Sequence, residues 1–226
     1  MSASSRESWP GENGEPDEGD SVDEEAEEEE YGPDEEADEA GELSDELEDE
    51  LPQLRLAGHA PGELEIPDEV NVLEGSPIGG RRGVAIVASR FNGDITNKLL
   101  ASALAELERA GVAKDAITVM PVPGAFELPL GAMALAKTRR YSCVVALGCV
   151  IRGETAHFDY VAGEAASGLQ LAALETGVPV AFGVLTVDTL QQANARADKG
   201  AEAVRTALEM ADVFAQLRAT AAQAAR

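Results

Sequence analysis

Short apolar segments alternate with amphipathic ones through the second part of the chain. Four runs without helical spacing predict buried strands, at 84–89, 116–122, 141–151 and 179–187. Segments with apolar residues at helical spacing predict helices at 95–110, 124–138, 158–176 and 190–222. We expect Gly111 and Gly177 to end two of these helices, and the last helix to break near Lys199 and Gly200.

This order of elements predicts an α/β fold. Strands that are apolar throughout and separated by helices are typical of a parallel sheet covered on both faces. Such sheets bind ligands beyond the carboxyl ends of their strands. We therefore expect the functional residues in the turns that follow the predicted strands.

Charge divides the chain into two unlike parts. Residues 1–80 hold 29 of the 43 acidic residues and two basic ones, Arg6 and Arg55, whereas 81–226 hold 14 acidic and 15 basic residues. An acidic segment rich in Gly and Pro buries too little apolar surface to offset its chain entropy. We expect 1–69 to be a disordered tail, dispensable for catalysis, that either solubilises the protein or acts electrostatically by recruiting basic proteins or limiting assembly. The domain would span 70–226.

The apolar runs are too short for a membrane protein. None approaches the ~18 residues that would cross a bilayer, and no signal-peptide pattern follows Met1. We expect a cytoplasmic protein. Cys143 and Cys149 lie six residues apart in one predicted strand, so both point to the same face and cannot form a disulfide with each other. We expect two buried thiols.

The stretch from Ala146 to Val161 carries the clearest chemistry. A predicted strand ends there in a turn with a glycine, an acid, a hydroxyl and a histidine, and a helix follows. Free N–H groups and the positive dipole end at a helix start bind anions. His157 stands close to Thr155 and can exchange a proton near neutral pH. The stretch indicates phosphate capture beside proton transfer.

Five separated motifs, in order along the chain, resemble those of the lumazine synthase family. They are Ser89-Arg-Phe-Asn92, Val122-Pro-Gly-Ala-Phe-Glu-Leu-Pro129, the stretch 146–161, Phe182-Gly-Val-Leu-Thr186 and Gln192-Ala-Asn-Ala-Arg196. The resemblance runs from about Val70 to the C-terminus. It implies a three-layer, flavodoxin-like α/β/α fold.

The resemblance also implies a step of riboflavin biosynthesis. The family condenses two small molecules, 5-amino-6-(ribitylamino)pyrimidinedione and 3,4-dihydroxy-2-butanone 4-phosphate, to 6,7-dimethyl-8-ribityllumazine and releases phosphate. It uses no cofactor and no metal, and no His/Cys/Asp cluster in the sequence has metal-ligand spacing.

Site residues follow from the resemblance position by position. His157 would transfer protons, and Phe91 would stack on the pyrimidine. The residues expected around the pyrimidine and ribityl groups are Phe91, Asn92, Ala125, Phe126, Glu127, Cys149, Val150, Ile151 and Phe182. Those expected at the phosphate are Gly153, Glu154, Thr155 and Arg196, with Glu154 acting through its backbone N–H.

The resemblance further implies a homo-oligomer built from pentamers. Phe182 and Arg196 would come from the adjacent subunit, and 71–75 would add a strand to a neighbour's sheet. Riboflavin synthase is a candidate partner. Lys199 and Glu202 match further charged positions, but the junction before Lys199 is several residues shorter than in the family. Their roles, and whether pentamers stay single, pair or form a shell, are open.

Two other classes of protein are open alternatives. A non-catalytic shell protein on the same fold would use the acidic tail, but it would not need His157 or Arg196. A flavodoxin-type flavin or nucleotide binder would carry a Ser/Thr-rich loop after its first strand, where this chain has Arg90-Phe-Asn-Gly. No Gly-x-Gly-x-x-Gly run follows a predicted strand, which argues against a Rossmann dehydrogenase. A near-neutral domain with an acidic tail disfavours nucleic-acid binding.

Overall fold

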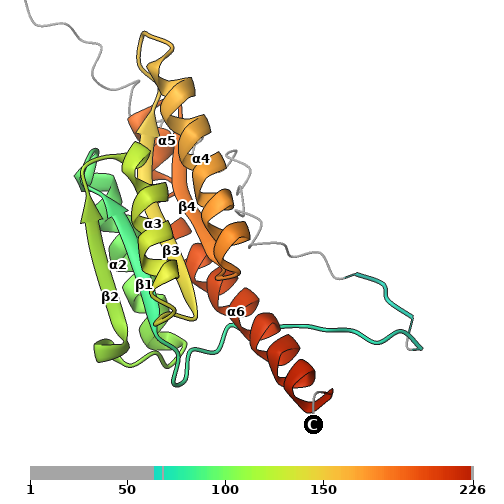
Figure 1. Cartoon of the computed structure of the whole chain (residues 1–226). Coiled ribbons are helices and arrows are strands. Elements are labelled where there is room, and N and C mark those ends of the chain that lie inside the picture. Colours follow the sequence, from blue (N-terminus) through green and yellow to red (C-terminus); the bar gives the residue numbers. More distant parts are fainter. Residues whose placement is uncertain (1–63, 68, 225–226) are drawn as a thin grey trace, which may run out of the picture. The chain divides into compact units, whose positions relative to one another are not determined.

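Four parallel β-strands form the middle layer of the protein (Figure 1). The computed structural model describes residues 64–67 and 69–224. The strands are β1 (Val84–Ser89), β2 (Ile117–Val122), β3 (Cys143–Ile151) and β4 (Val180–Val187). They lie in the order β2-β1-β3-β4, and each runs parallel to its neighbours. The predicted parallel sheet is confirmed.

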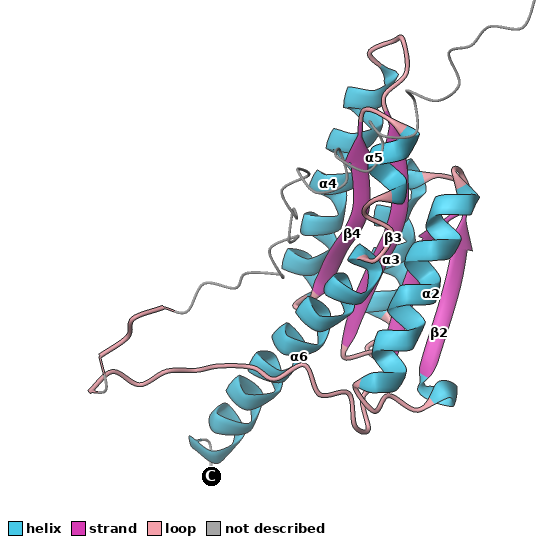
Figure 2. Ribbon diagram, turned by 180° about the vertical axis from the view of Figure 1, so that it is seen from behind, coloured by secondary structure: helices cyan, strands magenta, loops and turns pink. Residues whose placement is uncertain are grey.

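Helices cover both faces of this sheet. Those on the face toward the viewer in Figure 1 are α3 (Leu128–Lys137) and α4 (His157–Thr176). Those on the opposite face, turned toward the viewer in Figure 2, are α2 (Gly93–Arg109), α5 (Leu190–Asn194) and α6 (Lys199–Ala224). Two short 3-10 turns, η1 (Lys114–Ala116) and η2 (Ala125–Glu127), precede β2 and α3. The three-layer α/β/α arrangement is confirmed.

Strand β1 contributes to the apolar cores on both faces of the sheet. Its side chains alternate, so that Val84, Ile86 and Ala88 pack with α2 and α6. Ala85 and Val87 pack with α3 and α4. Because every one of these side chains is buried, the strand is apolar at each position from Val84 to Ala88 rather than at every second one.

Most predicted elements agree closely with the observed ones. Gly111 and Gly177 have φ values of 83° and 63° and follow α2 and α4 directly or after one residue. A left-handed glycine is a common end for a helix. The helix predicted over 124–138 begins as η2, and Pro129 stands in the first turn of α3, where a missing N–H costs no helical hydrogen bond.

The predicted break in the last helix is present but lies slightly earlier than expected. The last helix was expected to break near Lys199 and Gly200, but the break lies at 195–198 and these two residues begin α6. A β-carbon on Gly200 would stand 2.0 Å from the backbone carbonyl oxygen of Leu99 in α2. The glycine is therefore required by the close approach of two helices, not by the end of one.

A buried carboxylate joins the same two helices. Glu106 of α2 is 7% exposed and accepts a hydrogen bond from Arg109 Nε at 2.9 Å. Its Oε2 also lies 3.5 Å from Arg205 Nη1 on α6. The hydrogen bond from Arg109 is the main cause that lowers the pKa of Glu106, so this carboxylate remains charged in the packed layer.

The predicted acidic tail, 1–69, lies outside the described residues except for 64–67 and 69. Between 69 and 83 the described chain forms no helix or strand. None of the helices in the described part of the chain combines the length and apolar character needed to cross a membrane.

The segment before β1 runs along α6 of its own chain. Gln216 Nε2 donates to the carbonyl oxygen of Glu74 at 2.8 Å, and the N–H of Ser76 donates to Asp212 Oδ2 at 3.1 Å. Next to these contacts, Val72 and Leu73 are about half exposed. The pairing of 71–75 with a neighbouring sheet is not tested by a single chain and stays a prediction.

The close approach of α6 to α2 predicts that Gly200→Ala destabilises the fold. The added methyl group must push the helices apart or distort the first turn of α6. We expect the free energy of unfolding to fall by about 1–3 kcal/mol, the usual cost of overpacking. Denaturant unfolding at fixed protomer concentration measures it.

Gly163→Ala is the matched control. Gly163 lies inside α4, and a β-carbon there meets nothing within 4 Å. Because alanine favours a helix by about 1 kcal/mol over glycine, this variant should be as stable as the natural chain or more stable. Equal loss of stability in both variants would contradict the close-approach explanation.

Candidate active site

The ends of β1 and β3 mark the point where the strand order of the sheet reverses. From β1 the chain passes through α2 to β2, and from β3 it passes through α4 to β4 on the other side. Connections that leave in opposite directions open a crevice at the carboxyl ends of the strands. Asn92 bridges this crevice, because its Nδ2 donates to the carbonyl oxygen of Cys149 at 2.9 Å.

The backbone of Asn92 is left-handed, with φ 55° and ψ 42°. Asparagine is one of the few residue types besides glycine that visits this region routinely. The conformation turns the chain sharply from β1 into α2 and aims the side-chain amide at β3. A local backbone requirement and a long-range hydrogen bond therefore meet in one residue.

The turn after β1 is also held against the turn after β2. The N–H groups of Arg90 and Phe91 donate to the carbonyl oxygens of Val122 and Pro123, at 2.8 and 3.0 Å. These bonds continue the pairing of the two strands beyond their ends. They bring two of the predicted motifs side by side.

These turns and the start of α4 enclose a cleft of about 570 Å³. This volume lies in the range of small-molecule sites. The predicted site residues that line it are Phe91, Asn92, Ala125, Phe126, Glu127, Cys149, Val150, Ile151, Gly153, Thr155 and His157. The fold thus gathers residues from three separate turns into one cavity.

One wall of the cleft presents aromatic rings and a carboxylate. Phe91 and Phe126 are 71% and 57% exposed, which leaves apolar ring surface open to a planar ligand. Glu127 Oε2 accepts a hydrogen bond from the N–H of Gly124 at 2.9 Å, which fixes the carboxylate beside the rings. Its Oε1 makes no hydrogen bond within 64–67 and 69–224 and can accept one from a ligand hydroxyl.

The opposite end of the cleft has the character of an anion site. The loop after β3 leads to the N-terminus of α4, whose first residue is His157. The N–H of His157 lies 3.5 Å from Thr155 Oγ1, at the limit of a hydrogen bond. Gly153 and Thr155 line the cleft from the same loop. An anion here would meet N–H groups and the positive end of a 20-residue helix.

The two thiols are buried, as the sequence predicted. Both point to the face of β3 that packs with α2 and α6. Burial raises the pKa of Cys143 to about 12 and that of Cys149 to about 11. Both thiols are therefore protonated near neutral pH. Cys149 also lines the cleft, and its backbone carbonyl oxygen accepts the hydrogen bond from Asn92.

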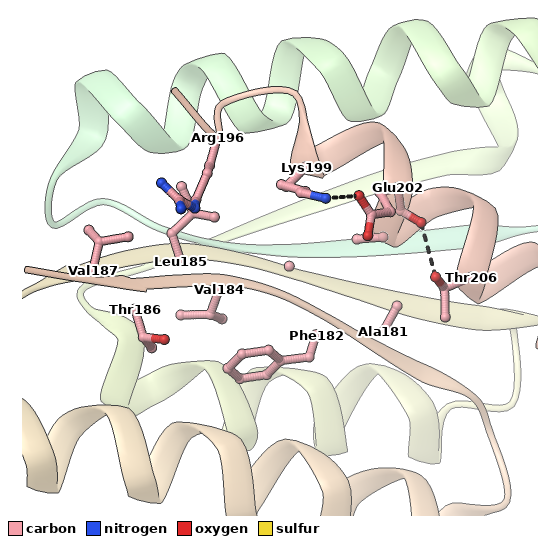
Figure 3. A pocket seen from close by; sticks show the side chains of 12 residues that line it. Ala181, Phe182, Val184, Leu185, Thr186, Val187, Arg196, Lys199, Glu202 and Thr206 are labelled. Carbon is pink, nitrogen blue, oxygen red and sulfur yellow. Dashed lines mark hydrogen bonds and ion pairs between the residues drawn. The ribbon is translucent and has the colours of Figure 1, made fainter. Parts of the chain in front are cut away.

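Five predicted residues do not line this cleft. Glu154 lies exposed in the loop after β3. The other four, Phe182, Arg196, Lys199 and Glu202, line a different cleft of about 440 Å³ between β4 and α6 (Figure 3). Within one chain, the residues expected at the phosphate thus fall into two separate groups.

The second cleft lies beside the edge of the sheet, because β4 pairs only with β3 in the described chain. Arg196 Nη1 donates to the carbonyl oxygen of Gln192 at 3.0 Å. Lys199 and Glu202 form an ion pair with each other. Figure 3 shows Phe182 on the other side of β4 from this pair, and its ring is 46% exposed.

Comparison with known proteins identifies the family. The family model described as 6,7-dimethyl-8-ribityllumazine synthase matches residues 82–215. The chain belongs to this family. Two of its similar relatives, from Yersinia pestis (strain Pestoides F) and Yersinia pseudotuberculosis serotype O:1b (strain IP 31758), carry the same name. Each is 53% identical over 155 residues, which cover 66% of this chain and 99% of the relative.

The lumazine synthase match includes every strand and every residue that lines either cleft. The structure adds three residues to the first cleft that the sequence did not single out, namely Phe158, Tyr160 and Val161, and it places Gly124 of the second motif there as well. Helical spacing from His157 could have found two of them, since residues three and four positions onward share its face. Tyr160 is 71% exposed and stands with Phe91 and Phe126 as a third open ring.

No group of three or more His, Cys, Asp or Glu side chains within the described ranges is placed to hold a metal ion. The polar groups of the first cleft are instead a histidine, a carboxylate, an amide, a hydroxyl and backbone N–H donors. This set suits hydrogen bonding and proton transfer to organic ligands.

The double role of Asn92 predicts a graded pair of variants. Asn92→Ala loses the amide donor and places alanine in a left-handed conformation, so the free energy of unfolding should fall by about 1–3 kcal/mol. Asn92→Gly loses the same donor but tolerates the backbone, and should cost less. Denaturant unfolding of both variants at one protomer concentration gives the order, and an unchanged stability in Asn92→Ala would contradict the bridging role.

Proposed function

We propose that this chain catalyses the reaction for which its relatives are named. It would condense 5-amino-6-(ribitylamino)pyrimidinedione with 3,4-dihydroxy-2-butanone 4-phosphate to 6,7-dimethyl-8-ribityllumazine and release phosphate. The observation that carries this proposal is the first cleft. Open aromatic rings, a fixed carboxylate and a histidine at a helix N-terminus lie there in one cavity of about 570 Å³.

The pyrimidine substrate suits the aromatic wall. Phe91 offers an exposed ring for stacking. The end of β3, from Cys149 to Ile151, offers backbone groups to the heterocycle edge, and Glu127 offers Oε1 to the ribityl hydroxyls. Each substrate group thus meets a chemically matched part of the cleft.

The phosphorylated substrate suits the start of α4. N–H groups at Gly153 and Glu154 and the hydroxyl of Thr155 would hold the phosphate. The amine of the first substrate attacks the ketone to give an imine with loss of water, phosphate is eliminated, and the ring closes with loss of a second water. His157 would move protons in these steps from its place beside the phosphate.

A shell or scaffold protein without activity is not favoured. Such a protein would not need a histidine, a fixed carboxylate and open rings around one cavity.

For this chain we also propose a cytoplasmic location and riboflavin synthase as a partner, both on family resemblance. For 1–69 we propose a disordered tail that acts through its charge.

We propose in addition that each site is shared between two subunits of a pentamer or a multiple of pentamers. Phe182 and Arg196 lie outside the cleft of their own chain, so a neighbour would have to supply them. The surface around β4 is suited to such contact, since it exposes Phe182, Leu174 and Met210 beside an unpaired strand edge. Head-to-tail contact of this kind forms a ring when the rotation from one subunit to the next closes, as it does in a pentamer.

The reaction itself is the first test. Purified protein given both substrates should form lumazine faster than the uncatalysed condensation. His157→Ala should lower kcat by about ten- to ten-thousand-fold, whereas Arg196→Ala should chiefly raise KM for the phosphorylated substrate. Steady-state kinetics separate the two parameters. Arg218→Ala is the control, because Arg218 is an exposed arginine far along α6, and both parameters should stay unchanged.

The shared site predicts complementation between impaired chains. In the mixed oligomer, a site is intact when its His157 comes from an Arg196→Ala chain and its Arg196 comes from a neighbouring His157→Ala chain. Oligomers co-refolded from equal amounts of His157→Ala and Arg196→Ala chains should recover about a quarter of the natural sites if subunits assort randomly in a head-to-tail ring. Activity is compared at concentrations of the phosphorylated substrate well below the KM of Arg196→Ala. If it stays at the level of the separate variants, or if the active species sediments as a monomer, the shared site is wrong.

A further inference from the structure

The exposed side chain of Arg152 makes several contacts next to the first cleft, although Arg152 does not line the cleft. It follows β3 directly, and its N–H donates to the carbonyl oxygen of Val187 at 2.9 Å. Its Nε donates to Asp188 Oδ1 at 3.0 Å, and its Nη1 donates to Asp159 Oδ1 at 3.1 Å. The guanidinium carbon lies 4.0 Å from the ring centroid of Phe158.

These contacts join three structural elements. Asp188 stands just after β4, Asp159 lies in the first turn of α4, and Phe158 lines the cleft from that same turn. Arg152 itself begins the loop that contains Gly153 and Thr155. One planar side chain therefore fastens the loop at its beginning and the helix at its start, on either side of the anion site.

The charges around Arg152 argue against a direct role in phosphate binding. Its single positive charge already faces two carboxylates, those of Asp159 and Asp188. A phosphate that approached this guanidinium would also approach both of these negative charges. The planar fork and the stacked ring hold the side chain in a fixed orientation, which suits a brace better than a ligand.

We propose that Arg152 is a positioning residue that holds the anion-binding loop and the N-terminus of α4, and with it His157, in the productive arrangement. This inference rests on the proposed function. Arg152 acts on the reaction through the loop and helix it fastens, without touching either substrate.

The same brace reaches the group that the chain would offer to its neighbour. The N–H of Asp188 donates to Gln192 Oε1 at 2.8 Å, and the carbonyl oxygen of Gln192 accepts from Arg196 at 3.0 Å. Arg152 thus connects, through Asp188, to the turn before α5 and to Gln192 in α5, whose carbonyl oxygen binds Arg196 in the junction that follows. Its loss should disturb both the His157 end of one site and the Arg196 end of the adjacent site.

A brace of this kind affects catalysis more than folding. The side chains of Arg152, Asp159 and Asp188 are 45%, 61% and 66% exposed, and exposed ion pairs contribute little to the free energy of unfolding. Small displacements of a reacting group, however, can slow an enzyme about hundredfold. The expected pattern is therefore impaired turnover in a stably folded protein.

The test compares Arg152→Met, Asp188→Asn and the double variant in the full-length protein. Arg152→Met should lower kcat by about ten- to a hundredfold and raise KM for the phosphorylated substrate, with KM for the pyrimidine and the melting temperature unchanged. Arg152→Lys should recover only part of the activity, because an ammonium group cannot replace the planar fork. The kcat of the double variant should be no lower than that of Arg152→Met alone, because both substitutions act on the same contact between Arg152 and Asp188.

Inorganic phosphate, measured as an inhibitor and by calorimetric titration, separates positioning from direct binding. Removal of the Asp188 charge would strengthen phosphate binding if only electrostatics mattered, whereas loss of positioning should weaken it. Weaker phosphate binding in Asp188→Asn supports the brace. Stronger or unchanged binding there, together with weaker binding in Arg152→Met, would make Arg152 a direct ligand and overturn the proposal.

Arg140→Met is the matched control. Arg140 lies before the start of β3, and its guanidinium carbon is 5.9 Å from the ring centroid of Tyr141. It is therefore another exposed arginine over an aromatic ring, but at the end of β3 away from the cleft. It should leave both kinetic parameters unchanged. The proposal would be overturned if Arg152→Met had the activity of the natural protein. It would also be overturned if the lower kcat came with a lower melting temperature, because loss of stability would then explain it. Absence of lumazine formation by the natural protein would reject the proposed function instead, and the phosphate titrations would still decide the role of Arg152.

Discussion

The hydrogen bond from Asn92 to the carbonyl oxygen of Cys149 links the ends of β1 and β3, where the order of the strands reverses. The two paired strands bond to each other along their length, but at this reversal their connections leave in opposite directions and open a crevice. The side-chain amide supplies that link. The aromatic wall, the fixed carboxylate and the start of α4 all take their places relative to these two strand ends.

The opposite side of the molecule is arranged by a second constraint, the close contact between α6 and α2. Gly200 lets the helices approach until backbone meets backbone, and Glu106 joins them with Arg109 and Arg205. This packing fixes where α6 begins. It thereby sets the position of the short 195–198 junction. Arg196 of this junction lines the second cleft, beside the open edge of β4.

The residues expected at the active site thus lie in two separate clefts of one chain. The first cleft holds the rings, the carboxylate and the histidine, and the second presents an arginine and a phenylalanine at a sheet edge. Arg152 and Asp188 connect the two across the ends of β3 and β4. The proposed completion of each site by a neighbour would account for a strand edge and large apolar side chains that an isolated monomer would normally protect.

The sequence alone determined the parallel sheet and the order of its helices, and its resemblance to the family pointed to eleven of the residues that line the first cleft. The central strands β1 and β3 are buried almost throughout, as their apolar runs predict, and parallel strands must present their following turns at one edge. The edge strand β2 was also expected to be buried, but in the single chain only Val122 of it is. Only the tertiary structure decided that Gly200 serves helix contact instead of helix ending, that Asn92 links β1 to β3, and that Arg196 stands apart from His157. It also revealed that Tyr160 lines the first cleft and that Arg152 contacts Asp159, Asp188 and Phe158. These facts depend on distances between residues far apart in the chain, which the local patterns of composition and spacing do not encode.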